Sequence, residues 1–336
     1  MKILLVDADS TIPNLALMKL SKFHKNKGDI VELQKLNIPY YPDQTRRSFY
    51  IDSKDYDKIY CSIIFDGSKN FINGKNIEYG GTGFDLSITL LEHIENLQPD
   101  YSIYPNNKIS YGFISRGCIR KCSFCKVPKK EGMIRQVNTI DQIVQHKQVK
   151  FLDNNFLALP NHKELLKELI DKNINCQFNQ GLDIRLVDEE NSSLLSQLNY
   201  LGNYIFAFDD ISYLPLIEEK IKILSWKKSW QFKFFVYIHP NMEIKNIVDR
   251  INWLKDNECL PYIMRDITCW KSIYNEFYID LAAYCNQVNL FKKMNFSEFL
   301  EARHTNKSRI KQSRNLFNSY HSTILNNNST LQNIIE

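Results

Sequence analysis

The stretch ISYGFISRGCIRKCSFC, residues 109–125, joins an apolar strand candidate to a loop that is rich in cysteine. Its first part, residues 109–115, has the composition of a buried strand. Three cysteines follow at C-x3-C-x2-C spacing, namely Cys118, Cys122 and Cys125. Thiolates at such spacing converge on one metal centre, and Gly117 lets the backbone bend closely around it. The stretch therefore predicts a strand that ends in a metal-binding loop.

The same rhythm of strand and helix continues after this loop. Further strands are expected over residues 149–153, 175–179, 204–208, 232–238 and 261–265. Amphipathic helices are expected over residues 162–172, 189–198, 214–226, 244–257 and 274–286. Repeated strand–helix units require parallel strands covered by helices. Since a full eight-stranded barrel takes about 250 residues and this region offers fewer, the sequence predicts an α/β fold with a partial (β/α)6 TIM-like barrel.

The barrel is expected to have a further domain on each side. Before it, apolar runs at residues 2–6 and 58–65 and helical spacing at residues 12–23 and 86–94 predict a small Rossmann-like α/β domain. After it, the chain from residue 291 is polar and mostly helical. The expected domains are therefore residues 1–105, residues 106–290 for the barrel, and residues 291–336 for a helical, basic C-terminal extension.

Composition limits the class of protein. The chain has 336 residues, of which 43% are hydrophobic, enough to bury a sizeable core. No run approaches the roughly 20 apolar residues of a membrane span, so we expect a cytoplasmic protein with no membrane partner. Apart from the tight group, the eight cysteines are scattered, unlike those of a small secreted disulfide scaffold. The net charge of +5 tolerates an anionic partner without indicating one.

The number of ligands in the loop separates the candidate metals. Structural zinc takes four closed ligands, and the next histidine, His146, lies about twenty residues beyond the loop. Three cysteines on a four-iron cubane instead leave one iron with an open position that can bind substrate. Two alternatives stay open: a non-catalytic zinc or iron–sulfur protein that binds nucleic acid, and three cysteines that are merely buried.

The spacing of the cysteines, the aromatic Phe124 just before the third of them, and their place after the first strand of a six-unit barrel resemble the radical S-adenosylmethionine superfamily. The resemblance implies a 4Fe-4S cluster held by Cys118, Cys122 and Cys125. It also implies that S-adenosylmethionine chelates the open iron and is cleaved to a 5'-deoxyadenosyl radical, which attacks a substrate. An electron donor such as flavodoxin or ferredoxin would be a further partner.

The N-terminal domain is similar to that of the cobalamin-binding subgroup of this superfamily. Tyr79 and the glycines at positions 80, 81 and 83 are similar to the glycine-rich turn of the subgroup. The loop at residues 7–11, however, lacks the histidine that would ligate cobalamin, since the first histidine is His24. We therefore expect a domain that has kept the fold and lost the cofactor.

Polar residues at the carboxyl ends of the barrel strands are the other site candidates, because chemistry in parallel barrels gathers there. By the resemblance, the expected cofactor-binding residues are Phe124, Asn154, Asn155, Gln180, Arg185 and Arg265. The expected catalytic residues are Asp183, Arg185 and Asp209. Forked guanidinium donors suit a methionine carboxylate or a substrate phosphate. For a residue such as Asn155, capping of the next helix is an equally good interpretation.

Two basic stretches bear on the substrate. The cysteine loop carries six cations with no acid among them, namely Arg116, Arg120, Lys121, Lys126, Lys129 and Lys130. A second group lies near the C-terminus, namely Arg303, His304, Lys307, Arg309, Lys311 and Arg314. At helical spacing Lys307, Lys311 and Arg314 would share a face. A nucleic-acid or nucleotide substrate is one hypothesis, and a solvated basic surface is the alternative.

Overall fold

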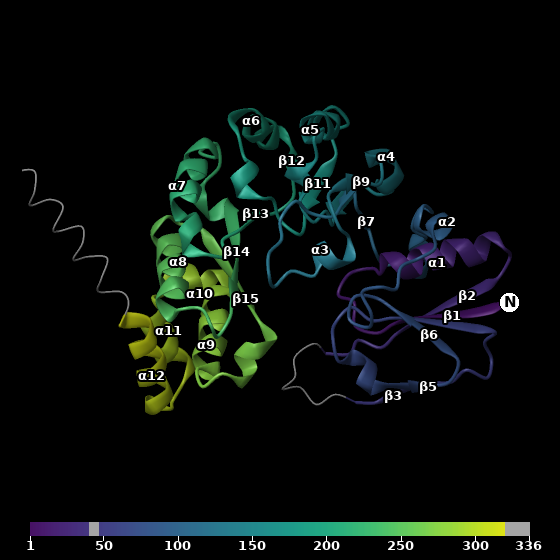
Figure 1. Ribbon diagram of the computed structural model, residues 1–336, viewed down its shortest axis with the longest axis horizontal. Helices are drawn as coiled ribbons and strands as arrows, with labels where there is room; N and C mark the ends of the chain where they lie inside the picture. The colour runs from purple at the N-terminus through teal and green to yellow at the C-terminus, as the bar shows by residue number, and fades with distance from the viewer. Residues whose placement is uncertain (40–46, 320–336) are drawn as a thin grey trace, which may run out of the picture. The chain divides into compact units, whose positions relative to one another are not determined.

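The computed structural model describes residues 1–39 and 47–319. It is a mixed α/β protein with several parallel sheets and, in the described part, twelve α-helices (Figure 1). The chain divides into two compact units, Met1–Asp153 and Asn154–Glu336. The domains expected at residues 1–105, 106–290 and 291–336 stay predictions.

The first unit contains ten strands and four α-helices among its described residues. The strands are β1 (Lys2–Asp7), β2 (Ile30–Lys35), β3 (Phe49–Ile51), β4 (Lys58–Ser62), β5 (Ile72–Gly74), β6 (Ile77–Gly80), β7 (Ile109–Gly112), β8 (Ser115–Arg116), β9 (Arg135–Gln136) and β10 (Gln148–Phe151). The helices are α1 (Leu15–Asn26), α2 (Glu92–Glu95), α3 (Val127–Lys130) and α4 (Ile140–Ile143). A parallel sheet has the order β2-β1-β4-β6, and β7 pairs in parallel with β10.

Strand β1 is buried on both faces of the parallel sheet. Ile3 and Leu5 pack against Leu17 of α1, the helix that runs along one face of the sheet (Figure 1). Leu4 and Val6 point to the opposite face and join a second apolar cluster. A strand covered on both sides needs apolar residues at successive positions, which explains the run at residues 2–6.

Three predictions in the first unit are wrong in extent. The strand expected over residues 58–65 ends at Ser62, as β4. The helix expected over residues 86–94 is reduced to α2, because Asp85 turns the chain by accepting bonds at 2.8 Å from both the backbone N–H and the hydroxyl of Ser87. The strand expected over residues 109–115 ends at Gly112. Beyond it, the N–H groups of Ile114 and Ser115 donate to the Asp153 carboxylate at 3.2 and 2.5 Å and leave the sheet.

The second unit contains five strands and eight α-helices among its described residues. The strands are β11 (Asn175–Phe178), β12 (Asn199–Tyr200), β13 (Tyr204–Ala207), β14 (Phe232–Ile238) and β15 (Leu260–Arg265). The helices are α5 (His162–Asp171), α6 (Glu189–Gln197), α7 (Leu214–Ile223), α8 (Ile244–Asp256), α9 (Asn275–Cys285), α10 (Val288–Lys293), α11 (Phe296–Arg303) and α12 (Lys307–Asn318). The strands and helices expected between residues 162 and 286 are confirmed to within a few residues at each end.

Strands β13, β14 and β15 form a parallel sheet in that order. Alternate residues of β14, from Phe232 to Ile238, are fully buried, and helices α8 and α9 pack on β15 (Figure 1). The intervening side chains, including Tyr237, are only half-buried. Because the three strands are parallel, their carboxyl ends lie at one edge of the sheet. That edge carries Asp209, His239 and Arg265.

The described part of the basic C-terminal extension, residues 291–319, is mostly helical, but much of its charge points inward. Residues 320–336 of the expected extension lie outside the described residues. The fully buried carboxylate of Asp280 accepts bonds from His304 Nε2 at 2.8 Å and from Arg309 Nη2 at 2.7 Å. Arg314 pairs with Glu301, which leaves Lys307 and Lys311 exposed on α12. The expected face of Lys307, Lys311 and Arg314 is therefore weaker as a phosphate-binding strip than the sequence indicated.

Candidate functional site

The cysteine loop, residues 117–132, is fixed at its base by backbone contacts. The short strands β8 and β9 pair in antiparallel fashion on either side of it. Gly117 has φ +88°, and a Cβ atom at this position would lie 2.3 Å from the carbonyl oxygen of Met133. The Cys118 N–H donates to the Gly132 carbonyl at 3.1 Å, which closes the loop. The sequence predicted that Gly117 bends the chain. The structure gives two reasons why only glycine fits there, namely the left-handed backbone conformation and the close approach to Met133.

Backbone amides also reach the sulfur atoms. The N–H of Arg120 donates to Cys118 Sγ at 3.3 Å, and the N–H of Val127 donates to Cys125 Sγ at 3.4 Å. Hydrogen bonds to sulfur are one means by which proteins set the potential of iron–sulfur clusters. All three cysteines are half-buried, and Phe124 between them is 39% exposed. The loop therefore offers sulfur ligands within reach of solvent.

The other five cysteines are different. Cys61, Cys176, Cys259, Cys269 and Cys285 are buried. Burial raises the pKa of Cys61, Cys176 and Cys259 to about 12 and that of Cys269 to about 11. All five thiols are therefore buried side chains of the kind that pack as small apolar residues.

The segment that carries the three cysteines, residues 117–125, offers sulfur ligands alone, because it contains no histidine or carboxylate. Within residues 1–39 and 47–319, no group of three or more His, Cys, Asp or Glu side chains is arranged to hold a metal ion. Three cysteines that are close in sequence, in a loop that closes at Gly117 and with amide donors to two of the sulfurs, nevertheless have the donor chemistry of an iron–sulfur cluster. A closed zinc site would need a fourth ligand from elsewhere.

Asp153 ties the start of the cysteine loop to the end of β10. Its carboxylate accepts bonds from the Ser115 N–H at 2.5 Å, the Ser115 hydroxyl at 2.6 Å and the Ile114 N–H at 3.2 Å. The side chain is almost fully buried, and this desolvation raises the pKa of Asp153 to about 6 despite the three donors. The residue holds two elements of the first unit in register.

A chain of ion pairs joins α1 to the cysteine loop within the first unit. Lys19 Nζ lies 2.8 Å from Glu95 Oε1, which in turn lies 2.9 Å from Arg116 Nη2. The other Nη of Arg116 contacts Glu131 at 2.9 Å. Burial lowers the pKa of Lys19, whose side chain is only 9% exposed. The loop's basic character is therefore partly neutralised by acids from outside the loop and at its far end.

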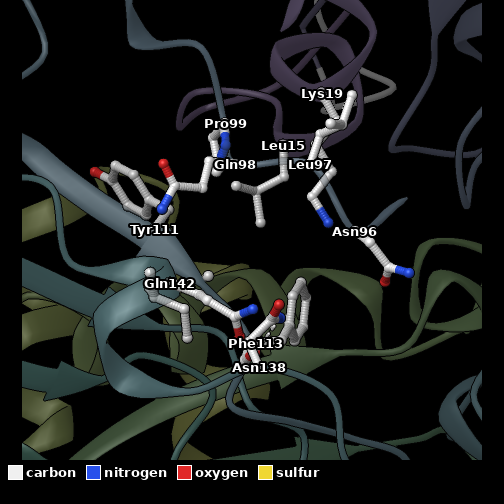
Figure 2. Close-up of a pocket in the computed structure, with 12 residues that line it drawn as sticks. Leu15, Lys19, Asn96, Leu97, Gln98, Pro99, Tyr111, Phe113, Asn138 and Gln142 are labelled. Carbon is white, nitrogen blue, oxygen red and sulfur yellow. Dashed lines mark hydrogen bonds between the residues drawn. The ribbon is translucent and has the colours of Figure 1, made fainter. Parts of the chain in front are cut away.

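Figure 2 shows the small pocket beside this chain of ion pairs. Lys19 and Leu15 of α1 line it together with Tyr111 and Gln142. Its volume of about 20 Å³ leaves room for about one water molecule. The pocket thus marks close packing of α1 against the β7 region and not a ligand site.

In the second unit, four predicted residues lie together at the strand ends. Asp183 is clamped by Arg185, with Nε to Oδ1 at 2.6 Å and Nη2 to Oδ2 at 3.1 Å. Asn155 Nδ2 donates to the same carboxylate at 3.2 Å. Burial raises the pKa of Asp209, which feels the charges of both Arg185 and Asp183. We call Asn155, Asp183, Arg185 and Asp209 the strand-end cluster.

Arg250 lies next to Asp209 of this cluster and bonds to the backbone at the strand ends. It was not among the sequence candidates. It is fully buried on α8, and Nη1 donates to the carbonyls of Phe208 and Tyr237 at 2.7 and 3.1 Å. Burial lowers the pKa of Arg250 to about 10, against the opposing charge of Asp209. The residue ties the carboxyl ends of β13 and β14 together. Its one sequence signal is an arginine on the apolar face of a helix.

The remaining candidates lie outside the strand-end cluster. Asn154 is half-buried beside Asn155, and Gln180 is exposed. Arg265 ends β15, with its guanidinium 4.5 Å from the ring centroid of Trp270. Sequence reasoning also missed Trp270, Asp153 and the ion pairs of Lys19, since none belongs to a recognisable motif.

The glycine-rich turn of the N-terminal domain has a packing role. A Cβ atom on Gly81 would lie 2.2 Å from the carbonyl oxygen of Ile63, and one on Gly83 would lie 2.4 Å from the carbonyl carbon of Phe65. The Asp9 carboxylate fixes the same segment by accepting the N–H groups of Ile64 and Phe65 at 2.8 and 3.0 Å. These glycines are explained by close approach to residues 63–65, and the loss of cobalamin stays a prediction.

No protein-family model, curated protein or solved structure matches the chain. In the described residues, none of the helices has the length and apolar character needed to cross a membrane.

Proposed function

We propose that this protein is a radical S-adenosylmethionine enzyme built on a partial (β/α)6 barrel. The observation that carries the proposal is the cysteine loop, in which three cysteines at C-x3-C-x2-C spacing lie in a loop closed at Gly117 and backbone amides donate to two of the sulfur atoms. Cys118, Cys122 and Cys125 would hold a 4Fe-4S cluster. When bound, such a cluster supplies an electron to S-adenosylmethionine and so starts radical chemistry on the substrate.

The chain's own residues would bind and orient the reactants. Phe124 offers an exposed ring beside the sulfur ligands. In the strand-end cluster, Arg185 and Asp183 form a charge-balanced pair that can bind polar groups of a ligand with little cost in reorganisation. Asp209 is the cluster's best candidate to carry a proton, because burial raises its pKa.

Anaerobic reconstitution with iron and sulfide tests the proposal. The protein should turn brown, show the spectrum of a 4Fe-4S cluster, and release 5'-deoxyadenosine from S-adenosylmethionine under a strong reductant. Cys122→Ala should abolish both iron uptake and cleavage. The matched control is Cys259→Ala, which removes a buried thiol from the second unit and should leave both intact.

A colourless protein that binds zinc tightly in anaerobic preparations would reject the enzyme and favour the non-catalytic alternative. Iron uptake that survives Cys122→Ala would equally reject the assigned ligand set. Because backbone contacts at Gly117, Cys118 and Gly132 fix the base of the loop, Cys122→Ala should unfold at the same urea concentration as the unmodified protein.

A further inference from the structure

The last two cysteines of the loop lie at the two ends of a tight turn. The N–H of Cys125 donates to the carbonyl of Cys122 at 3.1 Å, and Ser123 and Phe124 form the turn between them. In a four-residue turn of this kind the first and last Cα atoms are less than about 7 Å apart. A disulfide spans Cα distances of roughly 4.4 to 6.8 Å. The backbone thus already holds this pair close to the separation that a disulfide requires.

The first cysteine, Cys118, is held by a different part of the loop. Its N–H donates to the Gly132 carbonyl at 3.1 Å, beside the pairing of β8 with β9. Its Sγ accepts the Arg120 N–H at 3.3 Å. These bonds fix Cys118 at the base of the loop, whereas the turn begins at Cys122, further along the chain. The backbone therefore favours pairing of Cys122 with Cys125 over pairing of either residue with Cys118.

A small oxidant can reach this turn from solvent. Ser123 is exposed, Phe124 is 39% exposed, and the two cysteines that flank them are half-buried. The five cysteines outside the loop are buried, which shields them from such reagents. Oxidation of the reduced protein should therefore be confined to the cysteine loop.

We propose that Cys122 and Cys125 form a reversible disulfide in the metal-free protein, and that this disulfide prevents the cysteine loop from binding metal. The oxidant is a small disulfide such as oxidised glutathione. One cysteine displaces the first glutathione to give a mixed disulfide, and the second cysteine displaces the other. The two thiols lose two protons and two electrons, which leave in two molecules of reduced glutathione. The new sulfur–sulfur bond removes two of the three cysteines from metal binding.

Trypsin separates the candidate pairings, because arginines and lysines flank the cysteines. Cleavage leaves Cys118 in the peptide of residues 117–120 and both Cys122 and Cys125 in the peptide of residues 122–126. The metal-free full-length protein is equilibrated with oxidised glutathione, blocked with iodoacetamide and digested. Peptide 122–126 should be the main oxidised product, unalkylated and lighter than its reduced form by two hydrogen atoms, while peptide 117–120 is alkylated. A phosphine reductant added before blocking should return both peptides to the alkylated form.

Two variants test the pairing. Cys118→Ser should form the internal disulfide of peptide 122–126 to the same extent as the unmodified protein. Cys125→Ser should lose it completely and leave Cys122 as a glutathione adduct. A main product in which peptide 117–120 is cross-linked to peptide 122–126 would overturn the proposed pair. Glutathione adducts without an internal disulfide in the unmodified protein, or no oxidation at all, would overturn it equally.

The metal probe is Co²⁺, because the sulfide and thiols used to reconstitute a cluster would themselves reduce a disulfide. Thiolate-bound Co²⁺ should be detected by absorption in the reduced protein, be lost after oxidation, and return in full after phosphine treatment. Binding of Co²⁺ that survives oxidation, or that is absent from the reduced protein, would overturn the effect on metal binding. Neither measurement uses a cluster or S-adenosylmethionine, so both outcomes are independent of whether the proposed enzyme activity exists.

Discussion

The cysteine loop of the first unit and the strand-end cluster of the second are built in opposite ways. In the loop, backbone bonds fix the base, while the sulfur atoms stay half-buried. In the cluster, the functional groups themselves are bonded to one another, with Arg185 on Asp183, and Arg250 outside the cluster bonds two carbonyls at the nearby strand ends. The comparison teaches that the loop gains its chemistry from what it binds, whereas the cluster already has its charges arranged by the protein.

The largest expected effect concerns Arg250, which bonds the backbone at the strand ends near the cluster. Arg250→Met leaves the carbonyls of Phe208 and Tyr237 without their donor and should lower the free energy of unfolding by about 3 to 4 kcal/mol. Urea denaturation measures the loss. Arg303→Met, which changes a side chain that is 39% exposed, is the control and should cost less than about 1 kcal/mol. Similar losses for both variants would show that Arg250 does not hold the strand ends.

The second prediction concerns pH. Burial raises the pKa of Asp153 in the folded protein from the usual 3.8 to about 6, so protonation of this carboxyl favours the folded state. This stabilisation is fully present below the unfolded pKa and is lost as pH rises through about 6, a difference of roughly 3 kcal/mol. Asp153→Asn cannot ionise and should lack this loss. Urea unfolding between pH 4 and pH 7 should therefore give curves that converge or cross, and parallel curves would contradict the assignment.

The sequence predicted the two regions unequally well, for physical reasons. The spacing of three cysteines and Gly117 is local, so a metal-binding loop could be inferred without knowing any tertiary contact. The parallel strands followed from buried apolar runs such as residues 232–238, and the strand ends from the topology. Which arginine pairs with a carboxylate and which stacks on a ring could not be predicted, because Arg185 and Arg265 differ only in the partners that the fold brings to them.

Long-range contacts also explain why the sequence misjudged the end of β7 and the basic C-terminal stretch. Gly112 ends β7 because the next amides turn to Asp153, a residue 39 positions away from Ile114. The basic C-terminal stretch looked free of acids because Asp280 lies outside it in the sequence. Both corrections come from single carboxylates that act at long range, and periodicity carries no information about such contacts.

The third prediction tests whether the close approach of Gly117 to Met133 is needed to form the cysteine loop. Gly117→Ala places a Cβ atom 2.3 Å from a backbone oxygen and should cost about 2 kcal/mol or open the loop, with loss of iron uptake. Gly132→Ala, in the same loop, has φ +71° and nothing within 4 Å of the added atom, so only about 1 kcal/mol is expected. Iron content after reconstitution and urea unfolding measure both effects. Equal iron uptake by the two variants would show that the close approach at Gly117 is not needed for the loop to bind iron.

The smallest effect concerns the ion pairs that join α1 to the loop. Glu95→Gln removes the charge shared by Lys19 and Arg116 and should cost less than about 1 kcal/mol, because Glu95 is 35% exposed. Its local effect should be clearer than its global one. Hydrogen exchange of the amides in residues 117–132 should become faster in the metal-free protein, since Arg116 loses one of its two anchors. Glu92→Gln, an exposed change in the same short helix, should leave those amides unchanged. If the two variants exchange alike, the loop depends on its own backbone bonds alone, and its difference from the strand-end cluster is greater than the ion pairs indicate.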